Sequence, residues 1–195
     1  MELNRVKYIL RNFYSNDKVK FLGLFNSDNI RTSGVLFKTK EQSYMVFFQK
    51  FKNTNIVHLT VLFFDGSKTI TYFDSYGVAP GKDFLSKLQK LYPLSYTYLF
   101  SRVKIQKKNT CTCSLILFAL LDQVFNNNNN NNNNNTAAAV VSNHFNTSIE
   151  IAIRKLYTIP AKSREDFLLS NFKLKFPSVS LERLKSCQLK LSSAA

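Results

Sequence analysis

A cysteine, a glutamine, an aspartate and a histidine in this chain are spaced in a way that could support nucleophilic catalysis. Cys113 directly precedes the apolar run SLILFALL, which predicts a buried helix, and Gln106 lies seven residues before the cysteine. A thiol in the first turn of a helix lies where unpaired backbone N–H groups and the positive end of the helix dipole favour the thiolate. Cys113 is therefore a candidate nucleophile.

A nucleophilic cysteine needs a general base, a group that orients the base, and a hydrogen-bond donor for the oxyanion. His58 lies in the apolar run NIVHLTVLFF, and Asp74 lies near the end of the β-rich run TITYFDSYG. Asp65-Gly66 between the two runs predicts a hairpin turn. Because His58 and Asp74 lie at similar distances from that turn, we expect them to be cross-strand neighbours.

Together these residues predict a catalytic set of Cys113 as nucleophile, His58 as base and Asp74 as the group that holds the imidazole. Gln106 and the backbone N–H of Cys113 would then form the oxyanion hole. A purely structural interpretation remains open, in which His58 is a core histidine and Asp74 is a turn residue at the end of a strand.

The order and spacing of these four residues resemble those of the adenovirus endopeptidase (adenain) family and the related SUMO/ubiquitin-like cysteine proteases. The segments KFLGLFNSD and FDSYG are similar to early segments of that family, and Gln106, Asn109 and Cys113 match its pattern around the nucleophile. The resemblance spans most of the chain. It implies a cysteine endopeptidase that processes viral precursor or capsid proteins at glycine-containing sites.

The sequence departs from the family pattern at two positions. Leu59 stands where a tryptophan usually follows the histidine, and Ser114 stands where a glycine usually follows the nucleophile. Cys111 competes with Cys113 for the role of nucleophile. It lies at the wrong distance from Gln106 for the family and precedes the helix, so Cys113 is favoured.

Hydrophobic periodicity predicts helices flanking a mixed, mostly antiparallel central sheet, which is an α+β fold. The resemblance implies the fold of adenain and the SUMO proteases. The expected helices cover residues 3–13, 82–92, 148–157, 163–172 and 180–191, and expected strands besides the hairpin cover 35–37, 44–48 and 102–105, the last of which delivers Gln106.

The chain reads as one cysteine protease domain over residues 1–195, interrupted by an asparagine-rich insertion. Its 195 residues include 18 Phe and are 45% hydrophobic, enough for a sizeable core. Asn126 begins a run of asparagines that cannot bury a core, so residues 126–142 are predicted to form a disordered insertion. His144, close to it, is expected at the surface rather than as a second base.

A formal net charge of +15 indicates a polyanionic partner. Residues 151–190 alone carry nine basic and three acidic side chains. The resemblance implies DNA as an activating cofactor. An alternative is a lysine-rich composition whose basic side chains are simply solvated. The residues proposed to contact nucleic acid are Lys104, Lys107, Lys108, Arg154 and Lys155.

The three cysteines do not form a disulfide framework, which favours a reducing compartment. No metal site, small-molecule cofactor or membrane span is expected, and the protein is expected to be an intracellular monomer. The resemblance implies the host nucleus or the virion. Two alternatives stay open: a protease that removes ubiquitin-like modifiers, and a catalytically silent nucleic-acid-binding or capsid-associated protein.

Overall fold

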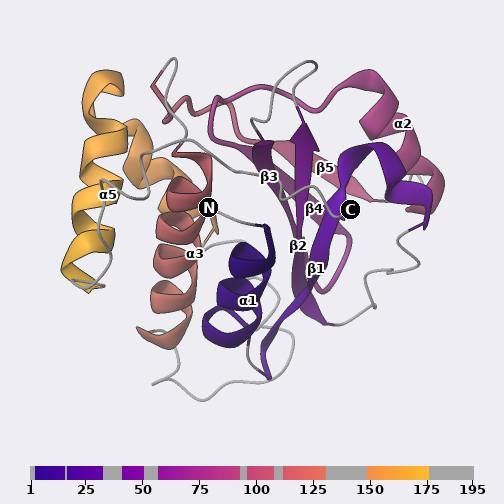
Figure 1. Cartoon of the computed structure of the whole chain (residues 1–195), viewed down its shortest axis with the longest axis horizontal. Helices are drawn as coiled ribbons and strands as arrows, with labels where there is room; N and C mark the ends of the chain where they lie inside the picture. Colours follow the sequence, from indigo (N-terminus) through magenta and orange to yellow (C-terminus); the bar gives the residue numbers. More distant parts are fainter. Residues whose placement is uncertain are drawn as a thin grey trace, which may run out of the picture.

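The computed structural model describes residues 3–15, 17–32, 41–50, 57–92, 96–107, 112–130 and 149–175. Helices pack on a five-stranded sheet in an α+β arrangement (Figure 1). Residues 149–157 are also helical. The elements are α1 (Leu3–Phe13), β1 (Val19–Asn26), the 3-10 helix Ser27–Thr32, β2 (Gln42–Lys50), β3 (Val57–Asp65), β4 (Thr69–Asp74), α2 (Lys82–Leu91), β5 (Thr97–Phe100), α3 (Cys113–Asn130), the 3-10 helix Ala161–Ser163 and α5 (Arg164–Lys175).

The strand order in the sheet is β1-β2-β3-β4-β5. β3 pairs antiparallel with β2 and β4, whereas the outer pairs β1–β2 and β4–β5 are parallel. The expected α+β class and mixed sheet are confirmed, but antiparallel pairing does not dominate, because half of the strand pairs are parallel. Parallel neighbours need a crossover connection, and α2 provides it between β4 and β5.

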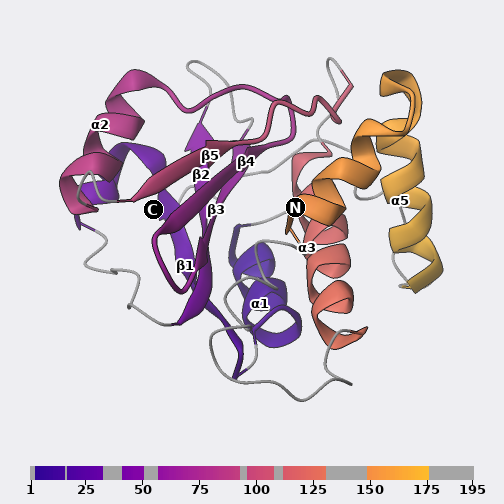
Figure 2. The ribbon, with the colours of Figure 1, turned by 180° about the vertical axis from the view of Figure 1, so that it is seen from behind.

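Each face of the sheet is covered by its own hydrophobic core. Alternate residues of β3 point to opposite faces, so Leu59, Val61 and Phe63 pack with α1 and α3, while Leu62 and Phe64 pack with α2. Figures 1 and 2 show α1, α3 and α5 on one side of the strands and α2 on the other. β3 is thus buried on both faces at the centre of the molecule.

Helix α3 is apolar on nearly all sides because it lies between the sheet and other helices. Residues 112–121 are all buried, and α3 packs against β3 and α5. The helix runs on through Asn130, so its backbone includes the first five residues of the asparagine-rich insertion that was expected to begin at 126. A helix that is already nucleated adds residues at little cost.

Several predicted elements are confirmed with small shifts in their ends. The helices at 3–13, 82–92, 148–157 and 163–172 and the strand at 44–48 all correspond to observed elements. β1 was not expected, although its sequence KFLGLFN is rich in apolar residues. The expected elements at 35–37 and 180–191 lie outside the described residues.

The strand expected at 102–105 is wrong, since the edge strand β5 covers Thr97–Phe100 instead. The Ser101 N–H still donates to the Tyr72 carbonyl at 3.0 Å, and the chain then leaves the ladder. Val103 and Ile105 are buried in the core on the α3 side of the sheet without being in a strand. Their apolar alternation therefore came from burial rather than from strand pairing.

Candidate active site

The hairpin between β3 and β4 sets the register of the first half of the site. The Asp65 carboxylate accepts hydrogen bonds from the backbone N–H groups of Ser67 at 2.8 Å and Thr69 at 3.0 Å. Gly66 adopts a φ of 83°, the left-handed conformation that glycine adopts readily. The turn predicted from Asp65-Gly66 is confirmed.

His58 and Asp74 are diagonal rather than direct neighbours across this hairpin. Asp74 pairs with Thr60, because the turn is centred on Ser67, one residue later than a direct pairing of His58 with Asp74 would require. The two residues are thus cross-strand neighbours as expected, displaced by two residues from direct register. His58 and Thr60 lie on the same face of β3, and this keeps the imidazole on the side of the carboxylate.

The two side chains form a buried pair. His58 Nε2 lies 2.9 Å from Asp74 Oδ2, and the two residues are 6% and 5% exposed. The backbone N–H of Tyr76 donates to the other carboxylate oxygen of Asp74 at 2.6 Å. Both oxygens of the carboxylate therefore have a partner, as a buried charge requires.

The electrostatics of His58 favour the imidazolium. Burial lowers the pKa of the imidazole, but hydrogen bonding and charge from Asp74 and Cys113 outweigh it and raise the pKa from 6.5 to about 9. At neutral pH the ring therefore holds a proton between a carboxylate and the sulfur.

Tyr76 covers the imidazole and was not singled out in the sequence. Its ring lies 5.0 Å from that of His58, measured between centroids, at an interplanar angle of 32°. Burial and then the charges of Cys113, Asp74 and Glu165 raise the pKa of the Tyr76 hydroxyl. The side chain therefore lies beside the charged groups of the site and shields one side of the ring. Its position two residues after Asp74 is the feature of the sequence that could have indicated this contact with His58.

Cys113 is the first residue of α3, as the sequence predicted. It is 5% exposed, and its Sγ lies 3.6 Å from the carbonyl oxygen of Val57, the residue before His58. The helix begins here although Ser114 stands where the resemblance leads us to expect a glycine. Leu59 points into the core on the α3 side of the sheet, where an aliphatic side chain packs.

Gln106 is held by the turn that follows Asp74. The Ser75 hydroxyl donates to Gln106 Oε1 at 2.6 Å, and the Ser75 carbonyl accepts from the backbone N–H groups of Ile105 and Gln106, each at 2.9 Å. With Oε1 bonded to a hydroxyl, the amide nitrogen is the end of the side chain that donates. Ser75 thereby fixes the orientation of the Gln106 amide, a contact that the sequence did not reveal.

Gly77 allows this connection to form. Its φ is 68°, and a Cβ at this position would lie 2.8 Å from both the Arg102 carbonyl oxygen and the Lys104 nitrogen. The tight approach brings the segment that ends at Gln106 against the turn at Ser75. The glycine of FDSYG is therefore explained by backbone contact.

The basic residues proposed for nucleic acid do not form a single cluster of uncompensated charge. Lys107 Nζ lies 2.7 Å from Asp166 Oδ2, and this hydrogen bond raises the pKa of the ammonium group. Arg154 lies 3.5 Å from Glu150. Lys104 and Lys155 are exposed. Lys108 lies outside the described residues, as do Cys111 and His144.

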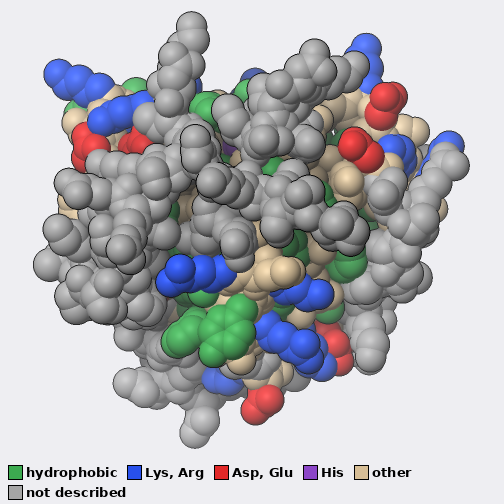
Figure 3. Space-filling view, in the orientation of Figure 1, with side chains coloured by type: hydrophobic (Ala, Val, Ile, Leu, Met, Phe, Trp, Pro, Cys, Tyr) green, Lys and Arg blue, Asp and Glu red, His purple; other side chains and the backbone are tan. Residues whose placement is uncertain are grey.

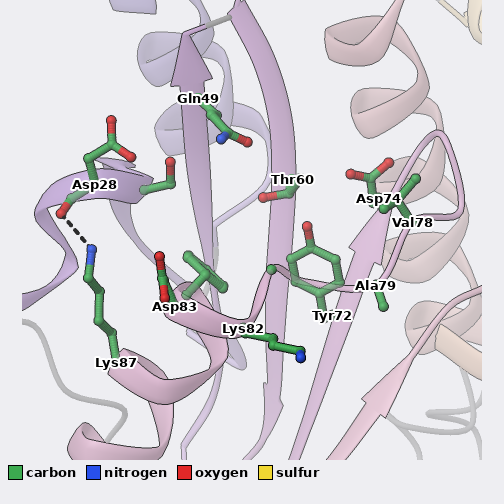
Figure 4. A pocket seen from close by; sticks show the side chains of 13 residues that line it. Asp28, Gln49, Thr60, Tyr72, Asp74, Val78, Ala79, Lys82, Asp83 and Lys87 are labelled. Atoms are coloured by element: carbon green, nitrogen blue, oxygen red, sulfur yellow. Dashed lines mark hydrogen bonds between the residues drawn. The ribbon is translucent and has the colours of Figure 1, made fainter.

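A polar cavity of about 480 Å³ lies on the α2 side of the sheet and reaches Asp74 (Figure 4). Its wall includes Thr60 and Tyr72 from the central strands and Lys82 and Asp83 from α2. Of the four proposed catalytic residues, Asp74 alone lines it. The cavity therefore lies behind the acid of the proposed site and does not present the sulfur.

Neither the known protein families nor the curated proteins give a match to this chain. Within the described ranges, no group of three or more His, Cys, Asp or Glu side chains is placed to hold a metal ion. No described helix is both long and apolar enough to span a membrane. The chemistry of the site therefore has to be argued from its own geometry.

Proposed function

We propose that this protein is a cysteine endopeptidase of the adenain type. One observation carries the proposal: a buried imidazole lies between the Asp74 carboxylate and the Cys113 sulfur at the start of a helix. A core histidine that serves only stability does not need a thiol on one side and a carboxylate on the other. The same residues match the order that the sequence shares with adenain.

In the proposed reaction, the Cys113 thiolate attacks the carbonyl carbon of the scissile peptide and forms a C–S bond. The carbonyl electron pair moves to oxygen, which accepts hydrogen bonds from the Gln106 amide and the Cys113 backbone N–H. The imidazolium of His58 gives its proton to the leaving amine as the C–N bond breaks. Water, deprotonated by His58, then attacks the thioester carbonyl, and expulsion of the Cys113 thiolate releases the acid product and restores the starting thiolate and imidazolium.

Asp74 keeps the imidazole in place through these steps. It stabilises the imidazolium and fixes Nε2 toward itself, which leaves Nδ1 for exchange with the sulfur and the leaving group. By resemblance, the substrates are viral precursor or capsid proteins cut at glycine-containing sites, in the host nucleus or the virion. A protease for ubiquitin-like modifiers would use the same groups on a different substrate.

A catalytically silent, nucleic-acid-binding role is the second candidate, and the outer face of α1 favours it. Arg5, Lys7 and Arg11 are exposed on this helix, Tyr8 is 63% exposed between them, and α1 contains no acidic residue. Figure 3 shows Lys and Arg side chains beside apolar ones over α1. Basic and aromatic side chains together suit a nucleic-acid strand. The same surface would serve an endopeptidase that uses DNA as a cofactor.

The test compares wild type with Cys113→Ala on a peptide library containing Gly-Gly and on a ubiquitin-like modifier fused to a reporter. Each substrate is assayed with and without DNA at low and moderate salt. Cleavage of peptides that requires Cys113 supports the endopeptidase, and preference for the fusion by more than tenfold supports the deconjugating alternative. If DNA binds but neither substrate is cut, the silent role is correct.

A further inference from the structure

Glu165 is a buried carboxylate that the proposed reaction does not use. It lies in the first turn of α5 and is only 3% exposed, whereas its neighbour Asp166 is exposed. A buried carboxylate is costly unless hydrogen bonds compensate it. Glu165 has two such bonds: Oε2 accepts from the Lys107 backbone N–H at 2.7 Å, and Oε1 accepts from the Thr112 hydroxyl.

These two donors flank the candidate site. Lys107 directly follows Gln106, and Thr112 directly precedes Cys113. The carbonyl of Thr112 also accepts the N–H of Ile116 at 2.9 Å, in the first turn of α3. One carboxylate therefore joins the proposed oxyanion donor to the start of the helix that carries the proposed nucleophile.

The beginning of α5 is itself fixed by neighbouring groups. Arg164 Nε donates to the carbonyls of Leu156 and Ile159 at 2.7 and 3.0 Å, and one terminal nitrogen donates to the Lys104 carbonyl at 3.1 Å. The Lys107 side chain also reaches Asp166 at 2.7 Å, but both side chains are exposed, so this contact adds little to the constraint. The backbone that carries Glu165 is thus held in place, and this fixes the position of its carboxylate.

We infer that Glu165 is a positioning residue that sets the separation between the Gln106 amide and the Cys113 backbone N–H, so that both donors reach one oxyanion. The inference rests on the proposed function. Oxyanion donors act only when they lie about 2.7–3.1 Å from the developing charge, and a loss of one donor costs about 10²–10³ in kcat. A residue that fixes both donors should therefore affect kcat strongly without touching substrate.

Two reactions of the same cysteine separate positioning from folding. Peptide cleavage passes through an oxyanion and needs both donors. Alkylation of Cys113 by iodoacetamide displaces iodide at a saturated carbon, forms no oxyanion and needs only the thiolate that His58 supports. A defect in donor spacing lowers the first rate and leaves the second unchanged.

The variants are Glu165→Ala, Glu165→Gln, Thr112→Val and Thr112→Ser, with Asp166→Asn as the matched control on the adjacent, exposed carboxylate. Glutamine keeps the shape of Glu165 but has only one acceptor oxygen. Valine keeps the volume of Thr112 but not its hydroxyl, which serine restores. Each variant is assayed for kcat, KM, the alkylation rate between pH 5 and 10, and cooperative thermal unfolding.

We expect kcat to fall about 10²–10³-fold for Glu165→Ala and about tenfold for Glu165→Gln and Thr112→Val. Thr112→Ser and Asp166→Asn should stay within about twofold of wild type. KM and the pH profile of alkylation should remain within about threefold in every variant. The double variant Glu165→Gln/Thr112→Val should lose less than the product of the single losses, because the two changes break one contact.

The inference is overturned if Glu165→Gln and Thr112→Val both keep kcat within twofold of wild type. It is also overturned if alkylation falls in parallel with kcat in variants that unfold cooperatively. If Glu165→Ala does not fold, the glutamine and valine variants decide. If wild type cuts no peptide, acylation of Cys113 by a p-nitrophenyl ester replaces cleavage as the oxyanion-dependent reaction, and a wild type inert to both removes the proposed function and this inference together.

Discussion

The two halves of the candidate site are held together by contacts of different range. His58 and Asp74 are 16 residues apart and belong to one hairpin, so strand register alone brings them close. The Gln106–Cys113 half is closed by Glu165, which lies 58 residues from Lys107 and 53 from Thr112. The base and its acid are thus specified locally, whereas the oxyanion side depends on the later helix α5.

In the hairpin half of the site, substitution of the base His58 should have the largest effect on catalysis. We expect His58→Ala to lower kcat/KM for peptide cleavage about 10⁴- to 10⁶-fold, because both proton transfers pass through the imidazole. Alkylation of Cys113 at pH 7 should fall with it, in contrast to the Glu165 variants. Cleavage assays and iodoacetamide labelling followed by mass spectrometry measure the two rates.

His144→Ala is the control, since it removes the other histidine of the chain. It should leave both rates within about twofold of wild type, because the sequence assigns His144 no role in the reaction. A His58→Ala protein that still labels and cleaves at the wild-type rate would contradict the assignment of the base. It would return His58 to the role of a core histidine.

The carboxylate should matter less than the base it orients. Asp74→Asn should lower kcat about 10²- to 10⁴-fold, because the imidazolium loses its charge partner and the ring its orientation. The pKa of His58 should fall from about 9 toward 6.5. An NMR titration of the ring C–H signals in a His144→Gln background reports one histidine. An unchanged titration in Asp74→Asn would show that Asp74 does not set the charge of His58.

The same difference in range explains what the sequence could and could not predict. The hairpin, its turn at Asp65-Gly66 and the start of α3 at Cys113 follow from short-range patterns. The exact register of the hairpin was not predictable, because hydrophobic alternation does not encode the residue on which the turn is centred. Glu165 gave no local signal, since its partners are distant in sequence and its segment looked only like the beginning of a helix.

Ser75 is an intermediate case. It follows Asp74 directly, but its role depends on Gln106, 31 residues away. The parallel pairs β1–β2 and β4–β5 were also not predictable. The direction of an edge strand depends on the path of the connection before it, which hydrophobic alternation does not show. Contacts within one hairpin were therefore predictable, and contacts between elements far apart in the sequence were not.

The charge of the His58 pair should also appear in the stability of the fold. The folded-state pKa of about 9 lies above the unfolded value of 6.5. The resulting stabilisation is fully present below pH 6.5 and is lost as pH rises through about 9, amounting to about 3 kcal/mol in the free energy of unfolding. Urea denaturation between pH 5.5 and 9.5 measures it. His58→Gln should flatten this decline, and a wild type whose stability rises over the interval would contradict the raised pKa.

Ser75 connects the two halves of the site, and its substitution should have the smallest effect on kcat. Ser75→Ala removes the hydroxyl that orients Gln106, and we expect kcat to fall about tenfold, the value of one hydrogen bond. Gln106→Ala removes the donor itself and should cost about 10²–10³. Because the hydroxyl acts through the amide, Ser75→Ala should have almost no further effect in the Gln106→Ala background. If the losses in kcat from Ser75→Ala and Gln106→Ala are additive, Ser75 acts on His58 or Asp74 instead of Gln106. Ser75 would then belong to the hairpin half of the site and would not connect the two halves.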